Sequence, residues 1–135
     1  METRIKVVIC NTSPLFRQGL KVLCRQGSSI EIVGEASTGK QAIEQVARLR
    51  PDIVLMDVAT PELTGFEATR RIKANNPKVK VLILTLYDDD DDTLVSLCLR
   101  AGASGYVSKD APMAELVKTM QALHRGGDYR HRRAA

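Results

Sequence analysis

Three residues with reactive side chains stand at the ends of three separate apolar runs of the sequence. Asp57, Thr85 and Lys109 each come at the end of a run rich in valine, isoleucine and leucine, or directly after it. They offer a carboxylate that can act as a nucleophile, a hydroxyl that can donate a hydrogen bond, and an ammonium group that carries positive charge. These are the groups that are needed to transfer an anionic group, such as a phosphoryl group, to a carboxylate, provided that the fold brings the three side chains to one place.

Apolar runs of strand length alternate with amphipathic stretches of helical period along the whole sequence. Strands are expected at residues 5–10, 30–34, 53–56, 79–84 and 105–107, and helices at residues 14–25, 39–49, 65–74, from 93 onward and 112–124. This alternation predicts an α/β fold with a doubly wound sheet of five parallel strands and five helices. Ligands and catalytic groups gather at the carboxyl ends of such strands, where Asn11 and Thr12 would join the three residues above.

Composition limits the class of protein. The chain has 135 residues, 44% of them hydrophobic and 27% charged, which is typical of one soluble globular domain. No apolar run reaches the about 18 residues that a membrane-spanning helix needs, and the first residues are too polar for a signal peptide. We therefore expect a cytoplasmic protein without a membrane partner. Three cysteines lie far apart inside apolar segments and are expected to be buried free thiols: Cys10, Cys24 and Cys98.

The positive charge of the chain is concentrated at its end. Four arginines and one aspartate follow Leu123, and they account for three of the four net positive charges. The globular part is nearly neutral, so it gives no sign of a nucleic-acid surface of its own. The aspartate run at residues 88–92 is expected to form a solvated helix N-terminus, where negative charge complements the helix dipole, and not a metal site.

Three segments carry a resemblance to a known family. The segments PDIVLMDVATPELTGFEATRRI, VLILTLYDDDDDT and RAGASGYVSKDAPMAELV resemble the receiver domain of NarL/FixJ-type response regulators, which have a LuxR-type output domain. The resemblance covers residues 4–124 and implies a flavodoxin-like fold with strand order 2-1-3-4-5. It implies a receiver domain at residues 1–124 and the start of a basic linker at residues 125–135. The linker would lead to a helix-turn-helix domain outside these residues; the alternative is a single-domain regulator in which residues 125–135 are a basic tail.

The family implies a role for each site residue. Asp57 would accept a phosphoryl group from a phosphohistidine of a sensor histidine kinase, while Lys109 and Thr85 would contact the phosphoryl oxygens. Thr85 and Tyr106 would form the switch, in which the aromatic ring turns inward when Thr85 moves. The main-chain carbonyl of Ala59 would be a metal ligand. The protein would be a regulator of a bacterial two-component system and not an enzyme, since no phosphate-binding glycine loop follows the first strand.

Asn11 and Thr12 depart from the family pattern, because this position usually holds two adjacent acidic residues that bind Mg²⁺. The result is a degenerate metal site made of Asn11, Thr12, Asp57 and Ala59. Mg²⁺ prefers carboxylate oxygens, and a loss of even ~3 kcal/mol would lower its affinity about a hundredfold. We therefore predict weak Mg²⁺ binding, impaired or absent phosphorylation by the ordinary route, and a direct ion pair between Lys109 and Asp57.

Two mechanisms remain open from the sequence. The first is a phosphorylation-dependent receiver that works at reduced rate, and the retained Asp57, Thr85, Tyr106 and Lys109 favour it. The second is a phosphorylation-independent module switched by a small ligand or a partner protein, and the loss of the acidic pair favours it. Under both mechanisms DNA would be bound only through an output domain outside this chain. A homodimer is expected, either through the first and last helices or through the last helix and its neighbouring strand.

Overall fold

The structure, a computed structural model, describes residues 4–27, 29–85 and 93–126. Its strands are β1 (Ile5–Cys10), β2 (Ile30–Ala36), β3 (Ile53–Asp57), β4 (Lys80–Thr85) and β5 (Gly105–Ser108). Its helices are α1 (Pro14–Arg25), α2 (Gly39–Leu49), α3 (Gly65–Asn75), α4 (Thr93–Arg100) and α5 (Met113–His124). The aspartate run at residues 88–92, which the sequence predicts to form a helix N-terminus, lies outside the described residues. No helix in the described ranges is long and apolar enough to cross a membrane.

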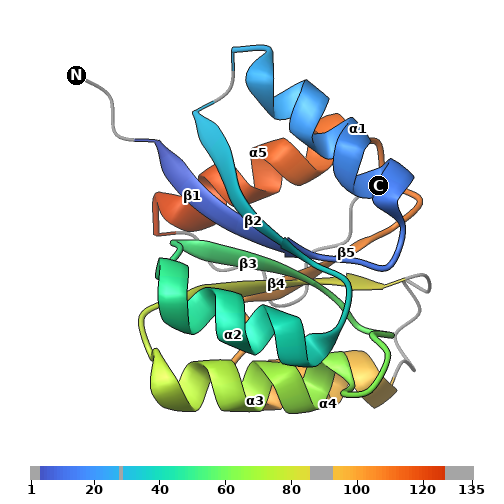
Figure 1. Cartoon of the computed structure of the whole chain (residues 1–135), viewed down its shortest axis with the longest axis vertical. Coiled ribbons are helices and arrows are strands. Elements are labelled where there is room, and N and C mark those ends of the chain that lie inside the picture. The colour runs from blue at the N-terminus through green and yellow to red at the C-terminus, as the bar shows by residue number, and fades with distance from the viewer. Residues whose placement is uncertain (1–3, 28, 86–92, 127–135) are drawn as a thin grey trace.

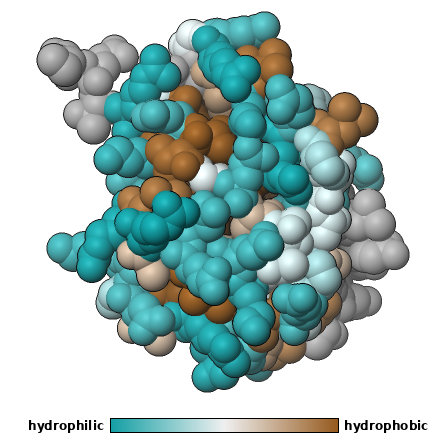
Figure 2. All heavy atoms as spheres, viewed as in Figure 1, coloured by the Kyte–Doolittle hydropathy of each residue, from teal (hydrophilic) through white to brown (hydrophobic). Residues whose placement is uncertain are grey.

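The strands form one parallel sheet in the order β2-β1-β3-β4-β5, which confirms the predicted fold class. Helices α1 and α5 cover one face of the sheet, and α2, α3 and α4 cover the other (Figure 1). The central strand β3 is buried along its whole length, so its run of apolar residues has no polar alternation. Two apolar cores result, one on each side of the sheet. The face drawn in Figure 2 is mainly hydrophilic, with smaller hydrophobic patches between polar side chains.

Strands β2, β3, β4 and β5 each end one or two residues later than the sequence predicts, so they extend further toward the carboxyl edge of the sheet. Strand β4 begins at Lys80 and not at residue 79, and Thr85 is its last residue instead of following the strand. Thr85 pairs with Ser108 of β5, so the ladder continues one residue further than the apolar run. The predicted helix start at Pro14 is confirmed, and the side chain of Ser13, directly before it, caps the helix by accepting a hydrogen bond from the Phe16 amide.

The three cysteines are buried free thiols, as predicted. Cys10, the last residue of β1, has no exposed surface. The pKa of its thiol is raised from 9.0 to about 12, mainly by burial and also by the negative charge of Asp57, while the positive charge of Arg17 opposes the rise. The thiol donates to the main-chain oxygen of Thr38 at 3.4 Å. A buried neutral thiol of this kind is chemically inert.

We expect removal of the Thr69 hydroxyl in α3 to raise the stability of the domain. The hydroxyl is fully buried and has no hydrogen-bond partner among the described residues, which costs free energy. Thr69→Val should raise the free energy of unfolding by about 1 kcal/mol in urea titrations. The matched control is Thr64→Val at the start of α3, where the lost hydrogen bond to the Glu67 amide should lower it by about 1 kcal/mol. A Thr69→Val protein less stable than wild type would contradict the assignment.

The Cys10 thiol predicts a pH dependence of stability. Above the unfolded pKa of 9.0 the unfolded chain loses the thiol proton, whereas the folded chain keeps it up to a pKa of about 12. The free energy of unfolding should therefore fall as pH rises through this window, by at most ~1.4 kcal/mol per pH unit from this group. Cys10→Ala should show a flatter decline. Parallel curves for the two proteins from about pH 8 to about pH 11 would refute the prediction.

Candidate functional site

Asp57 closes β3 at the carboxyl edge of the sheet, and its carboxylate is only 2% exposed. One oxygen, Oδ2, lies 2.7 Å from the ammonium nitrogen of Lys109 and accepts a hydrogen bond from the side-chain amide of Asn11 at 3.1 Å. The other, Oδ1, accepts from the main-chain amide of Ala59 at 3.0 Å. Donors therefore hold both oxygens of this buried carboxylate, and one of the donors carries a full positive charge.

Lys109 follows β5 and reaches Asp57 across β4, which separates their strands in the sheet. Its main-chain amide donates to the carbonyl of Thr85 at 2.7 Å, which fixes the chain just after β5. Its side chain is 29% exposed, so the ammonium group lies at the rim while its partner lies inside. The direct ion pair predicted from the sequence is confirmed.

Asn11 is buried and connects the first loop to Asp57. Its side-chain oxygen accepts from the Ser13 amide at 2.8 Å, which leaves its NH₂ group to donate to Asp57. A carboxylate at this position could accept from Ser13 but could not donate to Asp57. Thr12 is exposed, and no hydrogen bond between described residues joins it to Asp57. The structure thus brings one residue of the degenerate pair to the site and leaves the other outside.

The two predicted switch residues lie on neighbouring strands, the inner strand β4 and the edge strand β5. Thr85 at the end of β4 is fully buried, two strands from β1 and beside Asp57's own strand. Tyr106 on β5 is 8% exposed and belongs to the apolar cluster that also contains Val95 and Cys98 of α4. The aromatic ring is therefore packed inward in this structure.

The loop after Asp57 leaves no space for a side chain at Gly65. The Gly65 amide donates to the Val58 carbonyl at 3.0 Å, so α3 starts directly against the end of β3. A Cβ atom at Gly65 would lie 2.8 Å from the Val58 Cα and 2.9 Å from the Asp57 carbonyl oxygen. Such contacts are too close for any other residue, so α3 can start directly against the end of β3 because position 65 is a glycine.

The donor set does not fit a magnesium ion well. Nowhere in the described ranges do three His, Cys, Asp or Glu side chains come together to hold a metal. At the candidate site Asp57 is the one carboxylate, with Lys109 on its Oδ2, and the Asn11 oxygen is engaged by Ser13. Mg²⁺ would have to displace an ammonium group and bind neutral oxygens in place of carboxylates.

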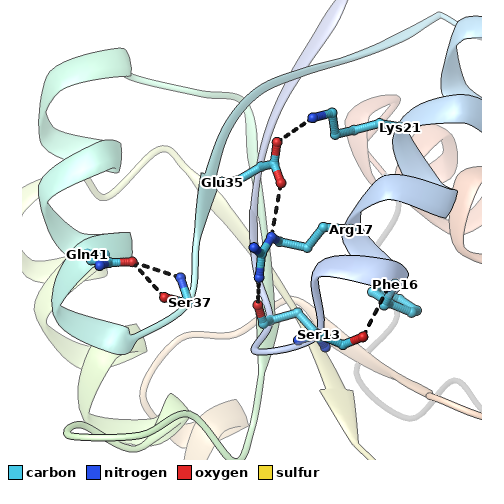
Figure 3. A network of polar contacts seen from close by, with 8 residues as sticks. Ser13, Phe16, Arg17, Lys21, Glu35, Ser37 and Gln41 are labelled. Carbon is cyan, nitrogen blue, oxygen red and sulfur yellow. Dashed lines mark hydrogen bonds and ion pairs between the residues drawn. The ribbon is translucent and has the colours of Figure 1, made fainter.

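A polar network that sequence reasoning missed joins α1 to the end of β2 (Figure 3). The Nη1 atom of Arg17 donates to the main-chain carbonyl of Asn11, and its Nε lies 2.9 Å from Glu35 Oε1. Lys21 Nζ lies 2.6 Å from Glu35 Oε2. The hydrogen bond from Lys21 lowers the pKa of Glu35, burial opposes this, and Arg17 adds to the lowering. The spacing of Arg17 and Lys21, one helical turn apart, was the available signal.

Comparison with known proteins agrees with this geometry. The model of the response regulator receiver domain family matches residues 7–121. Transcriptional regulatory protein DegU of Brevibacillus brevis is 36% identical over 130 residues, covering 96% of this chain and 54% of that protein. YdfI of Bacillus subtilis is 39% identical over 121 residues, covering 90% and 55%.

Solved structures lead to the same family. A two-component response regulator of the LuxR family from Aurantimonas sp. SI85-9A1 has a TM-score of 0.85 at 30% identity, covering 94% of this chain and 89% of that one. The receiver domain of NarL from Mycobacterium tuberculosis has a TM-score of 0.85 at 28% identity, covering 93% and 100%. This chain spans about half the length of the curated relatives that it matches. The chain belongs to the response regulator receiver domain family.

Proposed function

We propose that this domain receives a phosphoryl group on Asp57 from a sensor histidine kinase and controls transcription through a DNA-binding domain elsewhere in the whole protein. The observation that carries the proposal is a carboxylate 2% exposed at the carboxyl edge of the sheet, with a lysine ammonium group 2.7 Å away. The named relatives that are transcriptional regulatory proteins support the output. The domain is then a regulatory part and not an enzyme.

The chemistry follows from the charges at the site. An Asp57 oxygen attacks the phosphorus of a phosphohistidine, the phosphorus–nitrogen bond breaks, and the imidazole leaves with the bonding electron pair and takes up a proton from water. Lys109 must move from Asp57 to the phosphoryl oxygens, where its charge offsets the repulsion between the two anions. The Ala59 amide stays on the carboxylate, and the Thr85 hydroxyl would donate to a phosphoryl oxygen.

Weak Mg²⁺ binding is part of the proposal. With Asn11 and Thr12 in place of two acids, the pocket lacks the negative charge that attracts a divalent cation. In the resting state the Lys109 ammonium group then replaces part of the positive charge that a metal ion would supply at Asp57. The inward position of Tyr106 supports a resting state that partly resembles the switched one.

Treatment with acetyl phosphate tests the acceptor role. Intact mass measurement after incubation with acetyl phosphate and Mg²⁺ should show one added phosphoryl group. The group should be added slowly, because Lys109 holds Asp57 and Mg²⁺ binds weakly. Asp57→Asn should abolish the addition. The matched control is Asp52→Asn, which changes the aspartate directly before β3, at the opposite end of the strand from Asp57. This variant should be labelled like wild type. A wild-type chain that stays unlabelled would instead support a module switched by a small ligand or a partner protein.

Restoring the acids tests the metal prediction. Asn11→Asp combined with Thr12→Asp should tighten Mg²⁺ binding at least about a hundredfold over wild type, because each carboxylate adds a favourable charge interaction. Isothermal titration calorimetry near neutral pH measures both affinities. Asp57→Asn in the restored protein is the control and should weaken binding again. Submillimolar Mg²⁺ affinity in the wild-type chain would overturn the prediction.

A further inference from the structure

We propose that Arg17 is a positioning residue for Asp57, which acts by holding the main-chain carbonyl of Asn11 so that the Asn11 amide stays on the Asp57 carboxylate. The contacts of Arg17 and Asn11 do not depend on the proposed function. Their expected effect on phosphorylation rests on the proposed function.

Asn11 is held at each of its polar groups. Its main-chain amide donates to the Ala36 carbonyl of β2 at 3.0 Å, and its carbonyl accepts from Arg17. Its side-chain oxygen accepts from Ser13, and its side-chain NH₂ donates to Asp57. Asn11 is 4% exposed, so a carbonyl that lost Arg17 would be left buried without this charged partner. The loop would have to move to bring that carbonyl to water, and the amide on Asp57 would move with it.

Arg17 is itself fixed at both ends. Its main-chain amide donates to the Ser13 carbonyl at 3.1 Å in the first turn of α1, directly after the loop that contains Asn11. Its guanidinium is held by Glu35 through Nε, which leaves Nη1 aimed at the Asn11 carbonyl. A guanidinium presents donors in a rigid fork and can serve two partners in different directions, whereas a lysine offers one nitrogen. The side chain is 16% exposed, less than Lys21 at 25%.

Lys21 provides a matched comparison on the same helix. It pairs with the same Glu35 and carries the same charge, and among the described residues its ammonium group contacts Glu35 and not Asn11. Arg17→Gln and Lys21→Gln therefore each remove one positively charged partner of Glu35, and they differ in the contact with Asn11. Any effect specific to Arg17→Gln reports on that contact.

The experiment is ¹H–¹⁵N NMR of the 135-residue chain without any phosphoryl donor. In Arg17→Gln the side-chain amide signals of Asn11 and the main-chain signal of Ala59 should shift, and hydrogen exchange of the Asn11 side-chain amide should rise about tenfold. Lys21→Gln should keep both signals and exchange rates at wild-type values. Arg17→Lys should behave like Arg17→Gln, since one ammonium nitrogen cannot replace the fork.

Three outcomes overturn the proposal: unchanged Asn11 and Ala59 signals in Arg17→Gln, equal changes in Lys21→Gln, or wild-type behaviour in Arg17→Lys. Urea titration of each variant checks folding, and Glu35→Ala replaces Arg17→Gln if the latter does not fold, because it removes the acceptor that holds the guanidinium without altering α1. Loss of stability alone, with the Asn11 signals unmoved, assigns Arg17 a merely structural role.

Labelling by acetyl phosphate separates this proposal from the acceptor role of Asp57. If the wild-type chain is labelled, Arg17→Gln should be labelled about tenfold more slowly and Lys21→Gln at the wild-type rate. If no chain is labelled, the acceptor role fails, while the NMR comparison still decides whether Arg17 positions Asn11.

Discussion

The ion pair between Asp57 and Lys109 is the interaction around which the carboxyl edge of the sheet is organised. A carboxylate 2% exposed is costly to bury without a charged partner and several hydrogen bonds. Each neighbouring segment supplies one of these: the residue after β5 supplies the ammonium group, the loop after β1 supplies the Asn11 amide, and the loop after β3 supplies the Ala59 amide. The order of the strands is what places these three segments side by side.

Much of this arrangement could be predicted from the sequence because burial imposes a pattern on it. Strands covered on both faces must be apolar throughout, so each one is visible as a run that ends where the polar edge begins. Asp57 and Lys109 stand out because they are charged residues directly after such runs, and parallel strands bring their carboxyl ends to one edge. The fold and the residues of the edge follow from these two facts. The prediction of the ion pair also needed the family resemblance, because it rests on the absence of the two acids expected at Asn11 and Thr12.

The remaining features depend on geometry that apolar patterning does not encode. Thr85 lies inside β4 because its pairing with Ser108 extends the ladder past the apolar run. Asn11 turns toward Asp57 and Thr12 toward solvent because the Ser13 amide holds the Asn11 oxygen. Arg17 is a charged residue on an amphipathic helix, and by pattern it resembles any solvated side chain. Its inward direction is set by Glu35, a single acid near the end of an edge strand.

The replacement of two acids by Asn11 and Thr12 changes what the remaining cations must do. With acids and a divalent ion, a phosphoryl group would meet metal charge as well as Lys109. In this pocket Lys109 is the cation in direct contact with Asp57 among the described residues, so under the proposed function the resting carboxylate and an incoming phosphoryl group would compete for it. The same ion pair that stabilises the folded site would thus oppose the proposed modification. Arg17 is committed to Glu35 and Asn11, so its contribution is to hold the donor geometry and not to follow the phosphoryl group.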